Sequence, residues 1–254
     1  MIVAIIQARM GSTRLPNKVM KKILGKPLIS YLLDNVKKSK FVDKIILATT
    51  TNKEDDELVK YVHDLGYDVY RGSENDVLCR YYEAFKDLED IEQINGIVRL
   101  TGDCPLLQSK LIDKVIDTFL NSDYDHVCLS PHYAEGLDTE IFKPKLLVDA
   151  YNNAIKASQR EHVMLYITDN RDKYNMFQLE NSSDDSKYRI TVDEEKDFEL
   201  VKIIIEEFEK SKKELNIKNI KKFLDQNQNI FSLNSNILRN EGLLKSLKND
   251  KDIK

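Results

Sequence analysis

The sequence predicts an α/β fold with a largely parallel, doubly wound sheet, and three observations lead to this expectation. Short apolar runs rich in β-branched residues alternate with longer amphipathic segments from residue 2 to about residue 130. These runs are continuously apolar, as in parallel strands that are covered on both faces. Hydrophobic residues make up 41% of the chain and charged residues 32%, which is typical of a globular protein with a sizeable core.

The individual elements follow from the same pattern. Five strands are expected in the first half, over residues 2–8, 44–50, 67–72, 96–102 and 126–130. Helices are expected between them, over 27–39, 53–65, 74–88 and 109–120. After about residue 131 we expect a strand and two helices, then a β-rich piece over 175–180 and 188–193. A long helix over 195–211 begins with acidic residues and ends with lysine, in agreement with the helix dipole.

The domain organisation is simple, since neither an internal repeat nor a flexible linker interrupts the pattern. We interpret residues 1–211 as one domain in which about 131–190 form an insertion. The remainder, 212–254, is rich in Lys, Asn and Leu and is expected to be a helical C-terminal extension, packed on the outside or partly mobile.

Charge and composition exclude several classes of partner. Lys and Arg total 39 against 43 for Asp and Glu, so the net charge of −4 gives no reason to expect a nucleic acid or membrane partner. No apolar run approaches the roughly 20 residues of a membrane span, and the first residues do not resemble a signal peptide. Three cysteines without CxxC spacing, Cys79, Cys104 and Cys128, favour a reducing environment, so we expect a cytoplasmic protein.

The loop after the first strand is the clearest candidate for ligand binding, because ligands of open α/β sheets gather at the carboxyl ends of strands. Residues 7–18 place Arg9, Arg14 and Lys18 around the small residues Gly11 and Ser12. Such a loop can hold a polyphosphate, although it is neither GxxxxGK[ST] nor GxGxxG. The alternative is a solvated loop whose cations cluster by chance.

Two carboxylates suggest a divalent cation. Asp103 follows the fourth strand in RLTGDCP, and Asp193 ends the apolar run YRITVD. Together they are suited to hold Mg²⁺ that bridges phosphate oxygens. Alternatively, each aspartate caps the helix that follows it.

Further charged residues follow other strands or lie in the second half of the chain. Two of them are spaced by two residues in EGLDTEIF and so share one face of a strand. A lone histidine more often orients or hydrogen-bonds a ligand than acts as a general base. The set comprises Arg71, Asp76, Arg80, Asp138, Glu140, Arg160, Glu161, His162 and Arg189.

Five segments carry a resemblance to a known family: IIQARMGSTRLPNKVM, RLTGDCPL, GLDTEIF, REHV and RITVDEEKDFELV. In this order, over about residues 1–208, they resemble the cytidylyltransferase superfamily, which makes CMP-sialic acid and CMP-3-deoxy-octulosonate. The most similar branch is that of spore coat polysaccharide biosynthesis protein F. The resemblance implies a Rossmann-like nucleotidyltransferase fold, a homodimer with an arm after the fifth strand, and Mg²⁺-dependent transfer of CMP from CTP to a sugar-acid or phosphorylated acceptor with release of pyrophosphate.

The resemblance also implies roles for individual residues. The expected catalytic residues are Arg9, Lys18, Asp103 and Asp193, and the last two are the expected Mg²⁺ ligands. The expected nucleotide-binding residues are Ala8, Arg9, Gly11, Ser12, Arg14, Lys18, Arg71, Asp76, Arg80 and Asp103. The expected acceptor-binding residues are Asp138, Glu140, Arg160, His162 and Arg189.

Departures from the family pattern leave alternatives open. TGDCP stands where octulosonate enzymes have a QGDEP-type loop, and GSENDVLCRYYEA differs from the family's base-pocket motif. A nucleotidyltransferase that uses GTP or UTP is therefore one alternative, and a non-catalytic nucleotide-binding or scaffold protein is another. A glycosyltransferase would need a DxD-like motif at a strand exit, whereas Asp123 and Asp125 precede a strand.

Overall fold

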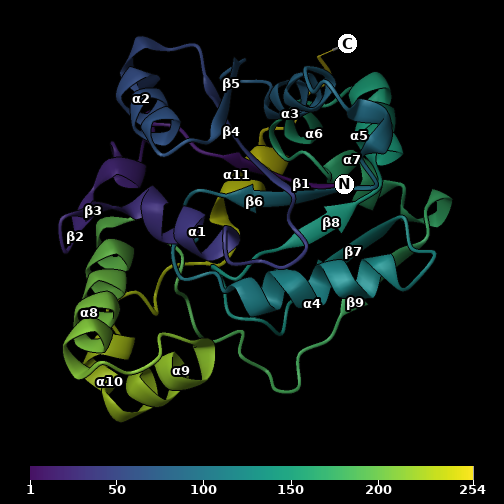
Figure 1. Ribbon diagram of the computed structural model, residues 1–254. Helices are drawn as coiled ribbons and strands as arrows, with labels where there is room; N and C mark the ends of the chain where they lie inside the picture. Colours follow the sequence, from purple (N-terminus) through teal and green to yellow (C-terminus); the bar gives the residue numbers. More distant parts are fainter. Residues whose placement is uncertain (254) are drawn as a thin grey trace.

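A seven-stranded sheet forms the centre of the computed structural model, which describes residues 1–253 (Figure 1). Its strand order is β5–β4–β1–β6–β8–β7–β9. The strands are β1 (Ile2–Gln7), β4 (Lys44–Thr50), β5 (Asp68–Gly72), β6 (Gly96–Thr101), β7 (His126–Leu129), β8 (Glu140–Phe142) and β9 (Met176–Leu179). A small hairpin of β2 (Lys22–Ile23) and β3 (Lys26–Pro27) lies outside this sheet.

The strand directions confirm the expected α/β fold with a largely parallel sheet. β1 pairs in parallel with both β4 and β6, β4 with β5, and β7 with β9. β8 is the exception, because it runs antiparallel between β6 and β7.

Helices cover both faces of the sheet. The α-helices are α1 (Leu28–Val36), α2 (Asp56–Asp64), α3 (Val77–Lys86), α4 (Ser109–Leu120), α5 (Pro144–Asn153), α6 (Ala157–Glu161), α7 (Leu165–Asp169), α8 (Glu195–Ser211), α9 (Ile217–Gln226), α10 (Gln228–Phe231) and α11 (Glu241–Lys248). Single 3₁₀ turns are η1 (Lys18–Met20), η2 (Lys53–Asp55), η3 (Ile91–Gln93) and η4 (Arg171–Lys173). The helices α1, α2, α4 and α8 pack on one face, and α3, α5 and α7 on the other.

The strand β1 shows why the apolar runs are continuous. Ala4 and Ile6 point into the core cluster on one face, and Val3 and Ile5 point into the cluster on the other. All four side chains are buried, as expected for a strand in the middle of a doubly covered sheet.

The prediction of a strand over residues 188–193 is wrong. Residues 188–193 form only an isolated bridge between Glu135 and Arg189 instead of a strand of the sheet. Ile190 and Val192 are nevertheless fully buried, and the backbone N–H of Val192 donates to the carbonyl of Asp103. The alternating apolar pattern therefore reflects burial of an extended loop that is held against the exit of β6.

The segment 131–190, expected to be an insertion, contributes to the central sheet and to one of its faces. It contains β8 and β9 of the sheet and the helices α5, α6 and α7. β9 has β7 as its partner on one side and is the edge strand of the sheet in the described part of the chain.

The C-terminal residues 212–253 contain α9, α10 and α11. Helix α9 buries Ile220 and Leu224 in the core cluster of the first face. The chain then crosses the molecule to α11, which contacts α6 near the carboxyl end of β6 (yellow in Figure 1). Across residues 1–253, no helix combines the length and apolar character needed to cross a bilayer.

Candidate active site

The loop after β1 is shaped by a buried carboxylate and a glycine. Asp55 is fully buried and accepts hydrogen bonds from the backbone N–H of Met10 (2.6 Å) and of Thr50 (3.1 Å). A Cβ atom on Gly102 would lie 2.7 Å from Cβ of Ala8, so only glycine lets the exits of β1 and β6 approach this closely. The first loop is thus fixed against the end of β6.

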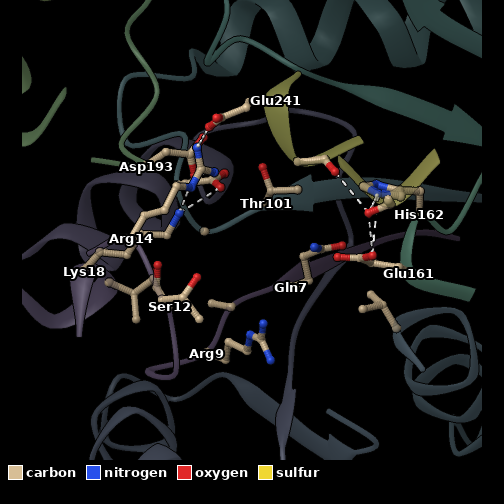
Figure 2. Close-up of a pocket in the computed structure, with 18 of the residues that line it drawn as sticks. Gln7, Arg9, Ser12, Arg14, Lys18, Thr101, Glu161, His162, Asp193 and Glu241 are labelled. Carbon is tan, nitrogen blue, oxygen red and sulfur yellow. Dashed lines mark hydrogen bonds and ion pairs between the residues drawn. The ribbon is translucent and has the colours of Figure 1, made fainter. Parts of the chain in front are cut away.

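A central pocket with a volume of about 390 Å³ opens at the carboxyl ends of β1 and β6 (Figure 2). The first loop, the exit of β6, α6 and α11 all contribute to its wall. It is lined by Gln7, Ala8, Arg9, Ser12, Thr13, Arg14, Lys18, Val19, Val77, Arg80, Arg99, Thr101, Gly102, Asp103, Glu161, His162, Asp193, Glu241, Gly242, Lys245 and Ser246.

Lys18 lies between the two candidate metal ligands. Its Nζ is 3.1 Å from Oδ2 of Asp103 and 2.8 Å from Oδ1 of Asp193. Burial by itself lowers the pKa of Lys18, but the two carboxylates outweigh burial and raise it. Burial likewise opposes ionisation of Asp103, but the Lys18 ammonium and a hydrogen bond from Thr101 hold the pKa of that carboxyl below its ordinary value. The Lys18 ammonium and the Asp103 carboxylate are therefore charged at neutral pH.

Neither aspartate acts as a helix cap. Helix α4 begins at Ser109, several residues after Asp103, with Gln108 as its N-cap. The N-cap of α8 is Glu194, which forms a capping box with Asp197. The oxygens of Asp103 and Asp193 are thus directed into the pocket.

Arg14 approaches one of these two carboxylates, that of Asp193. Its guanidinium lies 3.2 Å from Asp193 and 3.2 Å from Glu241 (Figure 2). Glu194 lies 3.9 Å away. Arg9 lies further along the pocket, where Nη1 donates to Glu74 over 2.6 Å. Together with Lys18, these arginines give the first loop three cations that line one cavity.

The predicted nucleotide-binding residues divide into two groups. Ala8, Arg9, Ser12, Arg14, Lys18, Arg80 and Asp103 line the central pocket. Gly11, Arg71 and Asp76 do not line it. Gly11 packs against Glu54, and Arg71 donates to the carbonyls of Thr50 and Asn52. Asp76 caps α3 by accepting a hydrogen bond from the backbone N–H of Cys79.

The predicted acceptor-binding residues divide in the same way. Asp138, Glu140 and His162 line an adjoining cavity of about 410 Å³. The residues that this cavity shares with the central pocket are Arg14, Arg99, Thr101, Asp103, His162, Asp193, Glu241 and Gly242. The Asp138 side chain is exposed to this cavity. Its partial desolvation by the cavity wall and the negative charge of Asp103 raise the pKa of its carboxyl group. Burial lowers the pKa of His162, so its imidazole is neutral at pH 7.

Arg160 and Arg189 line neither of these two cavities. Arg160 donates to the carbonyls of Ala154 and Tyr151 and lies 3.6 Å from Asp76. Arg189 forms ion pairs with Glu135 (2.7 Å), Asp193 (3.3 Å) and Asp197 (2.9 Å). Both guanidinium groups thus have partners within the protein.

Sequence reasoning did not single out several residues that line the pocket. Arg99 lies within the apolar strand β6, and only its charge in GIVRLT marks it. Glu241, Gly242, Lys245 and Ser246 come from α11, and no pattern near them indicates which part of the fold they reach. Ser246 Oγ donates to Glu161 (2.6 Å) and lies 3.1 Å from Nε2 of His162 (Figure 2).

Cys104 stands beside Asp103 but does not provide a nucleophile. The thiol is buried, and burial together with the charge of Asp103 raises its pKa well above the ordinary value. Because the thiolate is the reactive form, the neutral thiol is unreactive at physiological pH.

Comparison with known proteins agrees with this geometry. The sequence profile of a family described as "Cytidylyltransferase" matches residues 3–247. The chain belongs to the cytidylyltransferase family. It is therefore a nucleotidyltransferase enzyme, which confirms the resemblance seen in its motifs.

Three relatives illustrate the extent of the similarity. The cytidylyltransferase is 40% identical to the uncharacterized protein MJ1063 of Methanocaldococcus jannaschii over 238 residues, 93% of this chain and 95% of the relative. It is 34% identical over 212 residues to the spore coat polysaccharide biosynthesis protein SpsF of Bacillus subtilis, covering 80% and 85% of the two chains. A solved cytidylyltransferase from Leptospira borgpetersenii superposes with a TM-score of 0.83 at 33% identity, covering 94% and 98%.

Proposed function

We propose that this enzyme transfers CMP from CTP to a sugar-acid or phosphorylated acceptor, with Mg²⁺ as its cofactor and pyrophosphate as the second product. The observation that carries the proposal is the position of Lys18 between Asp103 and Asp193 in a pocket lined by the cations of the first loop. Carboxylates suited to a metal and cations suited to phosphates thus line the same cavity.

The first loop supplies the contacts for the triphosphate. Arg9, Arg14 and Lys18 would bind its oxygens and offset the charge that grows on the leaving pyrophosphate. In this reaction an acceptor oxygen attacks the α-phosphorus in line, and the bond from the α-phosphorus to the bridging oxygen breaks. Such chemistry depends on positioning and charge neutralisation more than on covalent catalysis.

The donor set fits Mg²⁺. Oxygens of Asp103 and Asp193 converge on the same ammonium, so a small cation can be shared between them. Mg²⁺ is commonly held by one or two carboxylates together with substrate phosphates. When bound by these aspartates, Mg²⁺ would polarise the α-phosphate and lower the pKa of an attacking hydroxyl. Lys18 would then contact phosphate oxygens instead of the carboxylates.

The adjoining cavity offers groups for the acceptor. Asp138 can accept hydrogen bonds from hydroxyls. Nε2 of the neutral His162 imidazole already lies 3.1 Å from Ser246 Oγ, so this side chain can offer Nδ1 to the acceptor. No residue of this cavity stands out as a general base in the part of the chain that the structure describes, and an acceptor phosphate needs none. Arg160 and Arg189 could bind the acceptor only by leaving their partners.

The setting of the enzyme is part of the proposal. The name of the SpsF relative supports a role in the synthesis of a surface polysaccharide or glycan. Three free cysteines suit a reducing cytoplasm, and the open edge at β9 is available for a homodimer contact. A nucleotidyltransferase for GTP or UTP is the alternative, because Arg71 and Asp76, two of the expected nucleotide-binding residues, lie outside the central pocket.

The first experiment measures the melting temperature with CTP, UTP, GTP or ATP, each with and without Mg²⁺. A ligand at 100 times its Kd stabilises a protein by about 2.7 kcal/mol. A shift of this size identifies which of the four nucleotides binds. We expect a Mg²⁺-dependent shift with CTP. A shift of the melting temperature with only one of the other nucleotides would mean that the enzyme uses that nucleotide instead of CTP. No shift with any nucleotide would favour a scaffold protein or an enzyme that binds its acceptor first.

A further inference from the structure

Arg99 is an arginine in the middle of an otherwise apolar strand. It follows Ile97 and Val98 of β6, both of which are fully buried. The guanidinium donates from Nη1 to Oε1 of Glu140 over 2.7 Å, across the β6–β8 pair. Its Nε is buried and has no hydrogen-bond partner among residues 1–253. One nitrogen of this cation is therefore held by Glu140, whereas the buried Nε–H is left for a ligand.

Glu140 holds Arg99 in a fixed orientation. The second carboxylate oxygen of Glu140 lies 2.7 Å from Nε2 of the buried His126, so the glutamate is held from both sides. Burial opposes ionisation of Glu140, but the contacts with His126 and Arg99 lower its pKa to about 2. The charges of Arg99 and Glu140 persist at every physiological pH.

Arg99 lines three neighbouring cavities. It borders the central pocket, the adjoining cavity with Asp138 and His162, and a side pocket of about 160 Å³ on the face of β6 and β8. The side pocket is lined by Arg99, Thr101, Cys128, Leu129, Asp138, Thr139 and Glu140. The Arg99 side chain is 21% exposed, and this exposed part faces these cavities. Its Cα lies about 7 Å from that of Thr101, two residues along the strand towards Asp103.

We propose that Arg99 binds the anionic group of the acceptor, a carboxylate or a phosphate, while Asp138 accepts hydrogen bonds from hydroxyls of the same molecule. This inference rests on the proposed function and adds the residue that recognises the charge of the acceptor. The arrangement suits an anionic polyol, because Arg99 is the one cation among the described residues that line the side pocket, and Asp138 of the same pocket can bind hydroxyls but repels a second negative group.

Stability alone does not explain why β6 carries this arginine. Replacing a buried ion pair by apolar residues of similar volume is often neutral or stabilising. A planar guanidinium with several donors is, in contrast, the group best suited to binding carboxylates and phosphates. The position of Arg99 at the junction of three cavities therefore points to recognition of a ligand.

The test follows the ¹⁵N–¹H signal of Arg99 Nε by NMR, with two small probes in separate titrations. Pyruvate represents a 2-keto carboxylate, and inorganic phosphate represents a phosphorylated acceptor. The Arg99 Nε signal is assigned by its disappearance from the spectrum of the Arg99→Lys variant. Titrations are made on enzyme loaded with CTP and Mg²⁺ and repeated without nucleotide, so that a failure of CTP to bind is separated from a failure of Arg99 to bind the anion.

We expect a saturable shift of the Arg99 signal with at least one probe, and the probe that causes it distinguishes a carboxylate from a phosphate. Calorimetry should show that probe binding about tenfold or more weaker in Arg99→Lys, as expected when a two-point contact is lost. Arg171→Lys, which replaces an exposed arginine in η4, should bind the probe like the unchanged enzyme. No shift with either probe, or equal weakening in both variants, would overturn the proposal.

Discussion

The carboxylate of Glu241 lies 3.2 Å from the guanidinium of Arg14, although the two residues are 227 positions apart in the sequence. Glu241 begins α11 in what we call the C-terminal strap, residues 239–253. The strap is tied down by polar contacts, since Arg239 donates to the carbonyls of Pro131 and Tyr133 and Asp250 accepts from Ser158. No residue of α11 is buried. Glu241 of the strap thus forms an ion pair with Arg14, one of the first-loop cations that we assign to triphosphate binding.

Removing this carboxylate should therefore improve nucleotide binding. For Glu241→Gln we expect the Kd for CTP with Mg²⁺ to fall by about two- to fivefold, because an exposed ion pair is weak and CTP no longer competes with it. The difference should shrink at 0.5 M salt, since added salt screens exposed charges. Calorimetric titration at low and high salt measures both effects.

The matched control for this variant is Glu209→Gln. Glu241 pairs with Lys245 as well as with Arg14. Glu209 likewise pairs with a lysine, Lys212, but it lies at the end of α8 and lines neither cavity of the site. It should leave the Kd unchanged. If Glu241→Gln instead weakens CTP binding, the strap positions Arg14 for the nucleotide and does not compete with it.

Glu140 should make the stability of the enzyme depend on acidic pH. Its pKa is lowered from 4.5 to about 2 by His126 and Arg99, against the effect of burial. A lowered pKa contributes stability that is present above the unfolded value and is lost as pH falls towards the folded value. The contribution is about 3 kcal/mol at pH 7 and about 1.4 kcal/mol at pH 3.

Urea denaturation of the unchanged enzyme and of Glu140→Gln at pH 7, 6, 4 and 3 measures this effect. The stability gap between the two proteins should be nearly constant from pH 7 to pH 6 and should narrow by more than half at pH 3. A gap that stays the same over the whole range would mean that the ionisation of Glu140 does not contribute to folding.

The sequence indicates some parts of this site well because their signals are local. The cations of the first loop and the aspartate after β6 stand directly at strand ends, where the topology brings them together. Arg160 and Arg189 show the limit of such reasoning, because an arginine's charge does not reveal whether the protein itself supplies its partner. Glu241 could not be predicted, since only the path of the chain after α10 brings it to Arg14.

Arg189 should matter for folding and for the position of Asp193. It is buried with Asp197, which is fully inaccessible, and Asn234 donates to Asp197 over 2.7 Å. Arg189→Leu would leave Asp197 and Glu135 without their cation. Breaking a buried pair in this way costs about 3–5 kcal/mol, which urea denaturation at pH 7 should detect.

A comparison with Asn234→Ala tests whether this network is structural. That change removes one neutral donor, so we expect a smaller loss of about 1–3 kcal/mol. If Arg189→Leu is as stable as the unchanged enzyme but loses affinity for the acceptor, Arg189 binds the acceptor, as the family resemblance implied.

The metal-binding role of Asp103 and Asp193 leads to the last prediction. Asp103→Asn or Asp193→Asn should abolish Mg²⁺-dependent pyrophosphate release while leaving the folded structure intact. Each variant keeps the size of the side chain and still has Lys18 beside the remaining carboxylate. Pyrophosphate release and circular dichroism, measured on the same samples, separate loss of activity from loss of fold. A near-normal rate in either variant would remove that aspartate from the metal site.

Lys18→Met supplies the complementary experiment. Without the ammonium, two carboxylates face each other with no cation between them, so the metal-free protein should melt at a lower temperature than the unchanged enzyme. Mg²⁺ can then take the place of the ammonium, and we expect it to raise the melting temperature of Lys18→Met more than that of the unchanged enzyme. Lys21→Met is the control, since Lys21 pairs with the exposed Glu195 and lines neither cavity. An equal response to Mg²⁺ in all three proteins would show that the metal does not bind between Asp103 and Asp193.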